Sequence, residues 1–295
     1  PIVDEIVTIR EVGPRDGLQS EPPLPPRTRA KLVEGLVDAG IRVVEAVAFV
    51  SPVKVPSMDQ PLEVMRQVQR NPDAEYIGLV PNLRGAEIAL GAAMDGVSVT
   101  LSASDEYSKK NVGRSRRESE EETRRIIEFL GEVCPDLKVD VVVSCAFGSP
   151  YGERIEKRDI RELTSSMKEL GATVTLADTT GVAMPAQIEE MFADVGTDVG
   201  AHFHDSQRTA LVNAYVALMA GCRRFDASIG GLGGSPFAQG SAGNLATEEL
   251  VRMLDHLDVQ SGIDLDALLR LSLWLSSELG HPMASPLAAT AAQLR

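Results

Sequence analysis

The sequence predicts an α/β fold in which eight strand–helix units close into a (β/α)8 barrel, followed by a C-terminal helical extension. Three observations lead to this prediction. Eight short runs rich in β-branched residues are spaced along the chain, amphipathic helical patterns lie between them, and no linker or low-complexity tract divides the 295 residues. Strands that alternate with helices pair in parallel through crossovers, and eight units in roughly 250 residues match a TIM barrel. An open doubly wound sheet is the alternative.

The expected strands follow one another in chain order. Their ranges are 6–13, 42–49, 75–81, 96–104, 138–147, 173–179, 198–205 and 224–231. The helix expected at 27–40 places Leu32, Leu36 and Ala39 at helical spacing and ends at Gly40, which suits a helix C-terminus. The helix at 118–133 opens with acidic residues, as the helix dipole favours. We expect a single domain over 1–295, with the barrel over about 6–255 and the extension over about 256–295.

Composition and charge narrow the classes of partner. The chain has 29 Lys and Arg against 43 Asp and Glu, and the resulting net charge of −14 repels nucleic acid and anionic membrane surfaces. The three cysteines, Cys134, Cys145 and Cys222, form no Cys-x-x-Cys pair, which is typical of a reducing compartment. No apolar run reaches the roughly 18 residues of a membrane span. We therefore expect a cytoplasmic protein that binds neither nucleic acid nor membrane.

A pair of histidines marks the seventh expected strand. The stretch GAHFHDS at 200–206 contains two of the four histidines of the chain. Side chains alternate along a strand, so His202 and His204 point to the same face, toward the barrel interior near the C-terminal end of the strand. One histidine there is typical of a packed core, whereas two at this spacing, followed by Asp205, favour a metal site. The active sites of such barrels lie at this end of the strands.

Other polar residues fall at the same strand ends. Arg15 and Asp16 lie in GPRDGLQ after the first strand, where turn formation is the structural alternative to a functional role. Glu45 is an acid in an otherwise apolar strand, so it needs a cationic partner such as Arg15. Asp178 ends the sixth strand, either as a helix cap or as an inward-pointing acid. These side chains are expected to meet at the barrel mouth.

A glycine-rich loop follows the eighth strand. Residues 230–244 include six glycines in fifteen positions, which favours close approach of backbone to a ligand over a plain flexible loop. Asn244 and Glu248 come next, each placed either to cap the following helix or to face the site. The barrel mouth thus offers oxygen and nitrogen ligands without a thiolate, which suits Mg²⁺ or Mn²⁺, with Zn²⁺ as an alternative. The candidate ligands are Asp16, His202, His204 and Asn244.

Six stretches carry a resemblance to a known family. In order they are EVGPRDGLQSE, VVEAVAFVSP, SCAFGSPYGERI, LADTTGV, HFHDS and GLGGSPFAQGSAGNLATEEL. They resemble the successive motifs of the 3-hydroxy-3-methylglutaryl-CoA (HMG-CoA) lyases, a family of metal-dependent lyase and synthase barrels, from about residue 6 to 290. The resemblance implies a TIM barrel that uses Mg²⁺ or Mn²⁺ to cleave an acyl-CoA into acetyl-CoA and acetoacetate.

The resemblance also implies roles for individual residues. The implied metal ligands are Asp16, His202, His204 and Asn244. Arg15 is implied as the cation that stabilises the enolate, and either His204 or an adjacent carboxylate is a candidate general base. The supporting acids are expected to be Glu45, Asp178, Asp205 and Glu248. Ser235 stands where the family has a proton-carrying cysteine, and a hydroxyl is less acidic than a thiol.

Contacts with the acyl-CoA are expected from two further parts of the chain. Gln19, Gly233 and Gly234 lie within the first and last motifs. Lys109 and Lys110 lie in the basic stretch 104–118, which is either a solvated face or an attractor for the CoA phosphates.

Two residues depart from the family motifs, and two alternative functions remain open. Ala48 replaces the family's small hydroxyl residue, and Gln207 lies where the family's Thr-Tyr-Gly follows the histidines. One alternative function is a lyase or condensing relative of the same architecture that acts on another 3-hydroxyacyl-CoA or a 2-hydroxy acid. The other is a metal- and CoA-binding protein of low activity. Barrels with extra C-terminal helices often dimerise, so we expect a homodimer.

Overall fold

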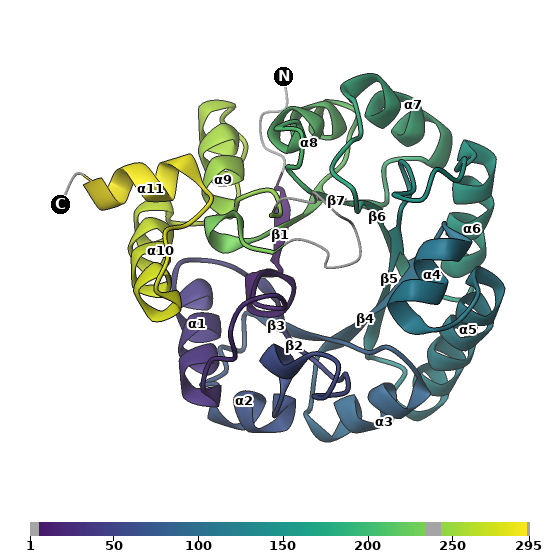
Figure 1. Ribbon diagram of the computed structural model, residues 1–295, viewed down its shortest axis with the longest axis horizontal. Coiled ribbons are helices and arrows are strands. Elements are labelled where there is room, and N and C mark those ends of the chain that lie inside the picture. Colours follow the sequence, from purple (N-terminus) through teal and green to yellow (C-terminus); the bar gives the residue numbers. More distant parts are fainter. Residues whose placement is uncertain (1–5, 234–242, 294–295) are drawn as a thin grey trace.

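The fold is a closed barrel of eight parallel strands in chain order, surrounded by helices (Figure 1). The computed structural model describes residues 6–233 and 243–293. The strands are β1 (Thr8–Glu11), β2 (Val43–Ala48), β3 (Glu75–Leu79), β4 (Gly96–Ser102), β5 (Lys138–Ser144), β6 (Thr173–Asp178), β7 (Gly200–Phe203) and β8 (Arg224–Ala227). Each strand falls inside one of the predicted ranges, and β8 pairs with β1 to close the barrel. The predicted TIM barrel is therefore confirmed.

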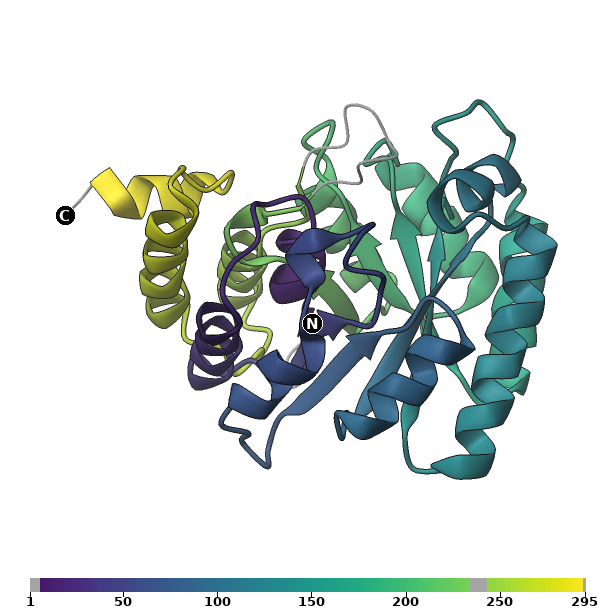
Figure 2. The same cartoon turned by 60° about the horizontal axis from the view of Figure 1, so that its bottom comes forward.

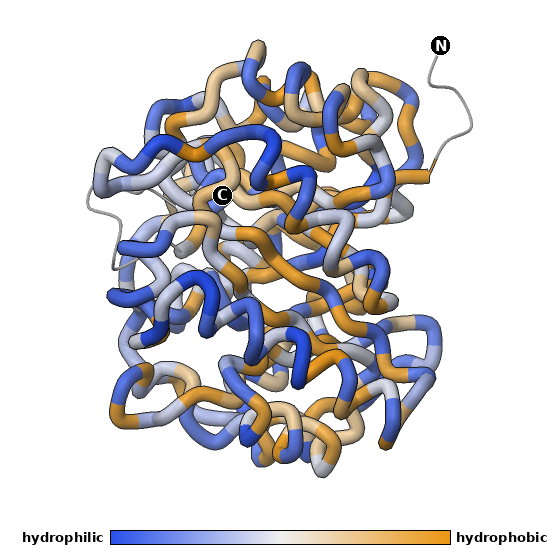
Figure 3. Tube along the Cα trace, turned by 90° about the vertical axis from the view of Figure 1, so that its right-hand side faces the viewer, coloured by the Kyte–Doolittle hydropathy of each residue, from blue (hydrophilic) through white to orange (hydrophobic). Residues whose placement is uncertain are grey.

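Helices cover the outside of the barrel. Around the strands lie α1 (Pro26–Asp38), α2 (Pro61–Gln67), α3 (Leu83–Gly91), α4 (Asp105–Val112), α5 (Arg116–Val133), α6 (Lys157–Glu169), α7 (Pro185–Val195), α8 (Ala210–Met219) and α9 (Thr247–His256). Short helical turns η1 (Gly13–Gly17), η2 (Pro56–Met58) and η3 (Ile229–Gly231) lie in the loops. Ser115 and Glu118 form a capping box at the start of α5. Hydrophilic and hydrophobic residues alternate along the chain trace (Figure 3). Helices α5 and α6, for example, bury apolar residues such as Ile126 and Leu163 on one face.

The predicted C-terminal extension consists of two helices beside the barrel, α10 (Leu265–Leu279) and α11 (Pro286–Gln293), yellow in Figure 2. Helix α10 packs on α1 so closely that a Cβ on Gly35 would lie 2.7 Å from Cδ1 of Leu271. Nζ of Lys31 lies 4.6 Å from the centre of the Trp274 ring. The extension is therefore fixed to the first helix of the barrel, on the side away from β4 and β5.

The carboxyl ends of parallel strands meet at one rim, so the loops after the strands converge there. This places η1, the loop after β2, the end of β7 and the segment before α9 at the same end of the barrel. Among the helices in residues 6–233 and 243–293, none combines the length and apolar character that a membrane crossing requires.

Candidate active site

A cavity of about 310 Å³ opens at the carboxyl ends of the strands. Strand-end residues such as Ala48, Leu79 and Val142 form apolar parts of its wall. Its polar wall includes Arg15, Asp16, Gln19, His202 and His204. The cavity therefore combines an apolar surface with a compact group of charged and titratable side chains, as expected of a small-molecule site.

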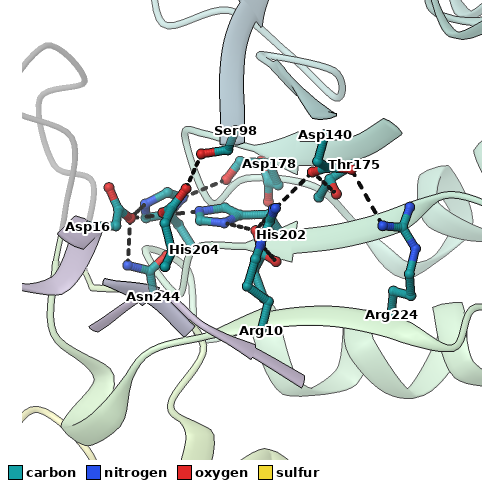
Figure 4. Close-up of polar contacts among 12 residues, drawn as sticks. Arg10, Asp16, Ser98, Asp140, Thr175, Asp178, His202, His204, Arg224 and Asn244 are labelled. Carbon is teal, nitrogen blue, oxygen red and sulfur yellow. Dashed lines mark hydrogen bonds and ion pairs between the residues drawn. The ribbon is translucent and has the colours of Figure 1, made fainter. Parts of the chain in front are cut away.

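Asp16, His202 and His204 converge at one side of this cavity (Figure 4). His202 lies in β7, His204 follows that strand, and Asp16 lies in η1 after β1. Nε2 of each histidine is 3.9 Å from Oδ2 of Asp16, and the candidate ligand atoms of the three residues all lie within 4.8 Å of one another. The 3.9 Å separations are longer than a hydrogen bond and shorter than the roughly 4.2 Å sum of two metal–ligand distances. Each histidine can therefore share a divalent ion with Asp16.

The protonation states of two of these groups also suit a cation. Burial alone would raise the pKa of Asp16, but Arg15 and the two histidines lower it to about 2, so the carboxyl is ionised. Burial, with the neighbouring His202, lowers the pKa of His204 to about 4, so its imidazole is neutral near neutral pH. Nδ1 of His204 lies 3.1 Å from the backbone oxygen of Asp178, which can only accept a hydrogen bond. The hydrogen therefore sits on Nδ1, and the lone pair on Nε2 faces Asp16.

Asn244 stands beside these three residues. An isolated antiparallel bridge joins it to His204. Nδ2 of Asn244 donates to Oδ2 of Asp16 (2.7 Å) and to the backbone oxygen of Leu232 (3.0 Å), so its NH₂ group faces Asp16. A half-turn of the side-chain amide would bring the carbonyl oxygen there instead. Helix α9 begins with Ala246 as its N-cap, so the alternative that Asn244 caps this helix is wrong.

Gly233 brings the glycine-rich loop into contact with η1. Its φ is +90°, and a Cβ built on it would lie 2.5 Å from the backbone oxygen of Asp16 and 2.9 Å from Nδ2 of Asn244. No side chain fits between these atoms, so the position requires glycine. Two other predicted residues of this loop, Gly234 and Ser235, lie outside the described residues.

Arg15 is held at the cavity wall by an extensive set of contacts. Its Nε donates to Oε2 of Glu45 (2.7 Å), and its Nη1 donates to Oδ1 of Asp16 (2.8 Å) and to Oε1 of Gln19 (3.3 Å). The other oxygen of Glu45 accepts from the Ser98 hydroxyl. Burial alone would lower the pKa of Arg15, but Glu45 and Asp16 raise it above its ordinary value. The expected cationic partner of Glu45 is thus Arg15, and the guanidinium keeps its charge.

Two predicted supporting acids, Asp178 and Glu248, hold loops in place by accepting hydrogen bonds from backbone N–H groups. The Asp178 carboxylate accepts from the backbone N–H groups of Val182 (3.3 Å) and Ala183 (3.0 Å), and so holds the turn after β6 rather than capping α7. Glu248 accepts from the backbone N–H of Gly230 (2.9 Å) and from the Ser272 hydroxyl. It is fully buried and is neither the cap of α9 nor part of the cavity wall. Burial raises the pKa of Glu248 to about 7.

Glu11 is a residue that the sequence analysis did not single out. It is fully buried at the end of β1, and its Oε1 accepts from the backbone N–H groups of Gly13 and Ile229, both at 2.8 Å. Burial raises the pKa of Glu11 to about 8. Glu11 and Glu248 thus hold the starts of the loops after β1 and β8. An acid inside an expected strand is the signal that marked Glu45, but Glu11 follows Arg10, a charged neighbour that makes the signal weaker.

The predicted residues Asp205, Lys109 and Lys110 lie outside the cavity wall and are engaged elsewhere. Asp205 accepts from the backbone N–H of Ala210 and pairs with Arg208, both at 3.1 Å. Nζ of Lys109 is 2.5 Å from Oδ2 of Asp105 in the preceding helical turn. Nζ of Lys110 is 3.8 Å from the centre of the Tyr151 ring.

The cavity wall includes Lys54, Asn111 and Arg114 instead. Arg114 belongs to the same basic stretch as the two lysines, so the stretch pointed to the right region but not to the right residue. Of the two departures in the motifs, Ala48 lines the cavity, whereas Gln207 is exposed and lies outside its wall.

Comparison with known proteins assigns the family. A family model described as HMGL-like matches residues 6–274, which is most of the chain. The chain belongs to the HMGL-like family. It is 35% identical over 291 residues to hydroxymethylglutaryl-CoA lyase YngG of Bacillus subtilis, with 95% of each chain covered. It is 38% identical over 300 residues to (R)-citramalyl-CoA lyase of Chloroflexus aurantiacus, with 95% of this chain and 93% of the relative covered.

A solved structure gives the same assignment. The HMGL-like chain matches an HMG-CoA lyase from Acinetobacter baumannii, in complex with coenzyme A and 3-methylmalate, with a TM-score of 0.91 and 36% identity. The match covers 96% of this chain and 94% of that one. The predicted family and the predicted enzyme class, a carbon–carbon lyase, are therefore confirmed.

Proposed function

We propose that this HMGL-like enzyme cleaves the C2–C3 bond of HMG-CoA to give acetyl-CoA and acetoacetate, using Mg²⁺ or Mn²⁺. The observation that carries the proposal is the convergence of three candidate ligands beside Arg15 on the wall of one cavity. The relatives named above support the acyl-CoA class of substrate. The residues proposed to hold the ion are Asp16, His202 and His204, with Asn244 as the fourth.

The donor set fits a divalent ion. One ionised carboxylate and two imidazoles, without a thiolate, suit Mg²⁺ or Mn²⁺ with positions left for substrate oxygens. When bound, the ion supplies a Lewis acid that holds substrate oxygens and favours loss of the hydroxyl proton. The hydrogen of His204 is on Nδ1, so its one lone pair is on Nε2. His204 cannot be a ligand and a general base through the same lone pair, and we assign it as a ligand.

Arg15 has the geometry of a charge stabiliser. As the C2–C3 bond breaks, the substrate hydroxyl gives its proton to the remaining candidate base, an adjacent carboxylate, and the hydroxyl-bearing carbon becomes the ketone of acetoacetate. The electron pair passes to C2 and the thioester oxygen as an enolate, which a proton at C2 converts to acetyl-CoA. Arg15 lines the cavity and is fixed by Glu45, so its positive charge is in place before the enolate forms. A preorganised charge of this kind stabilises the transition state without reorganisation. Ser235 is the proposed proton donor by its place in the sequence.

A second substrate is favoured by one observation, the 38% identity to (R)-citramalyl-CoA lyase. Citramalyl-CoA differs from HMG-CoA by one methylene between the hydroxyl-bearing carbon and the distal carboxylate, and its cleavage would release pyruvate with acetyl-CoA. One methylene changes specificity by roughly 10–200-fold in an apolar pocket.

The test is a comparison of initial rates on HMG-CoA and both enantiomers of citramalyl-CoA at equal concentrations with Mn²⁺ present. The assay separates acetoacetate from pyruvate and measures acetyl-CoA in every reaction. We expect acetoacetate from HMG-CoA at a kcat/KM at least about tenfold above that for either citramalyl-CoA. The reverse ratio, with pyruvate as the main product, would assign the second substrate. Tight binding of all three thioesters without acetyl-CoA would show a binding protein instead of a lyase.

A further inference from the structure

Behind the proposed metal site, a buried ion pair holds the second nitrogen of His202. Nδ1 of His202 lies 3.0 Å from Oδ2 of Asp226 in β8. Asp226 accepts two hydrogen bonds from Arg10 in β1, from Nε to Oδ1 and from Nη2 to Oδ2, both at 2.8 Å. All three side chains are buried inside the barrel. Arg10 and Asp226 were not among the predicted site residues.

The same arginine is anchored on its other side. Nη1 of Arg10 donates to Oδ2 of Asp140 in β5 (2.9 Å), as drawn in Figure 4. Asp140 also accepts from the hydroxyl groups of Thr173 (2.6 Å) and Thr175 (2.8 Å) in β6. The guanidinium therefore joins three strands across the barrel and holds the Asp226 carboxylate by a fork-like pair, which leaves that carboxylate little freedom to rotate.

The ion pair determines which atom carries the hydrogen between Asp226 and His202. The Arg10 guanidinium donates to both oxygens of Asp226 in a fork-like, charge-assisted pair, which is the contact of an ionised carboxylate. A carboxylate has no hydrogen to donate, so the hydrogen of the 3.0 Å contact belongs to Nδ1 of the histidine. In a neutral imidazole this leaves the lone pair on Nε2, the atom that lies 3.9 Å from Asp16.

We propose that Asp226 is a positioning residue, held by Arg10, that fixes His202 in the Nδ1–H tautomer so that its Nε2 can ligate a divalent ion. This inference rests on the proposed function of the Asp16 cluster. His204 obtains the same tautomer from the backbone oxygen of Asp178, which no side-chain substitution removes. The two histidines are thus set by different partners, one by a side chain and one by the main chain, and only the first can be altered by mutation.

The variant Asp226→Asn tests the proposal. An asparagine can turn its NH₂ group toward Nδ1 of His202 and donate to it, which moves the hydrogen to Nε2 and points it at the ion. The matched control is Asp140→Asn, because this change also removes a buried carboxylate bound to Arg10 but does not touch His202. A general disturbance of the buried charges would affect both variants, whereas loss of positioning would affect only the first.

The first readout is the tautomer in metal-free protein, measured by ¹⁵N NMR of labelled histidine in mildly alkaline buffer. The chain has four histidines, so the spectrum is simple to assign by single substitutions. We expect the Nδ1–H form of His202 in the wild type and in Asp140→Asn, and the Nε2–H form in Asp226→Asn. His204 should keep its Nδ1–H signal in all three and serves as the internal check that the barrel is folded. An Nε2–H form of His202 in the wild type overturns the proposal even if the variant does not fold.

The second readout is the affinity for Mn²⁺, measured by the electron paramagnetic resonance signal of the free ion. Loss of such an outer partner weakens metal binding by about 10–100-fold, which is the loss we expect for Asp226→Asn. Asp140→Asn should bind within about threefold of the wild type. Equal losses in the two variants, or none in Asp226→Asn, would overturn the positioning role. If the wild type itself binds no Mn²⁺, the proposed metal site fails, while the tautomer measurement still decides what Asp226 does to His202.

Discussion

Arg15 and Glu45 form a buried ion pair that joins the turn after β1 to strand β2. Nη2 of Arg15 lies 2.6 Å from Oε2 of Glu45, and the two side chains are 11% and 1% exposed. The pair explains why an apolar strand contains an acid, since the carboxylate holds the guanidinium at the cavity wall. Nη1 of the same guanidinium reaches Asp16, so the proposed charge stabiliser and one proposed metal ligand share a single arrangement.

The first prediction concerns this arginine. Arg15→Gln removes the positive charge beside the developing enolate, so kcat on HMG-CoA should fall about 10²–10³-fold, as for other preorganised donors to an oxyanion. Mn²⁺ should still bind, because the three candidate ligand atoms remain. Steady-state kinetics and a metal titration measure the two effects. Arg27→Gln, at an exposed pair with Glu34, is the control with unchanged kcat. An unchanged kcat in Arg15→Gln would show that Arg15 has only a structural role in the turn after β1.

A second prediction concerns the glycine that touches Asp16. Gly233→Ala places a Cβ against the backbone oxygen of Asp16 at a φ of +90°, so we expect weaker Mn²⁺ binding and at least about a tenfold loss of kcat/KM. Gly280→Ala has a similar φ of +75° but meets no atom within 4 Å, so it carries the backbone strain without the clash. Both variants should lose some thermal stability. Equal activity in the two would show that the close approach of Gly233 is unimportant.

The third prediction is the pH dependence of stability. Burial raises the pKa of Glu248 to about 7 and that of Glu11 to about 8. A carboxyl whose folded pKa lies above its unfolded value of about 4.3 binds more protons in the folded state. Its contribution to stability is complete below pH about 4 and is lost as the pH rises through the folded pKa. The free energy of unfolding should therefore decline between pH about 5 and 9.

Glu248→Gln should make this decline shallower, because the amide does not titrate. Urea unfolding of the wild type and the variant across the pH series gives the two slopes. Glu278→Gln, on the exposed side of α10, is the control that should keep the wild-type slope. Identical slopes for Glu248→Gln and the wild type would contradict the raised pKa.

The fourth prediction concerns CoA binding. Arg114 lines the cavity, where it donates to the backbone oxygen of Pro81 (2.8 Å) and its Nη1 lies 3.7 Å from Oε1 of Glu122. Lys109 and Lys110 lie outside the cavity wall and are engaged with Asp105 and Tyr151. Arg114→Gln should therefore raise KM for HMG-CoA about tenfold, the effect of 1.4 kcal/mol, with little change in kcat. The double variant Lys109→Gln, Lys110→Gln should change KM less. A larger effect of the two lysines, reduced by salt, would restore the interpretation of the basic stretch as the phosphate attractor.

The fold was predictable because its signals are local. Each strand is a short β-branched run and each intervening helix an amphipathic pattern, so the order of elements predicts a parallel sheet, and the number of units favours a closed barrel over an open sheet. The same holds for His202 and His204, whose spacing on one strand requires a shared face. The role of Glu45 could also be predicted. A buried acid needs a cation, and Arg15 lies in the turn that follows the preceding strand.

What the sequence could not show depends on long-range contacts. Glu248 accepts a hydrogen bond from the backbone N–H of Gly230. This contact forms only because η3 packs against α9. Lys109 looked available for phosphate, but an acid in the preceding helical turn, Asp105, neutralises it. Arg10 and Asp226 carried the same signal as Glu45, charges inside apolar strands, but their pairing across the barrel closure appears only in three dimensions.

The most direct test of the central claim is acetoacetate formation from HMG-CoA by metal-depleted enzyme, assayed before and after addition of Mn²⁺. The assay is run in parallel with Asp16→Ala. The account predicts no activity above that of the variant after chelation, recovery of the wild type on adding Mn²⁺, and no recovery of Asp16→Ala. Full wild-type activity in excess chelator, or equal recovery of both proteins, would contradict a divalent ion held by Asp16, His202 and His204.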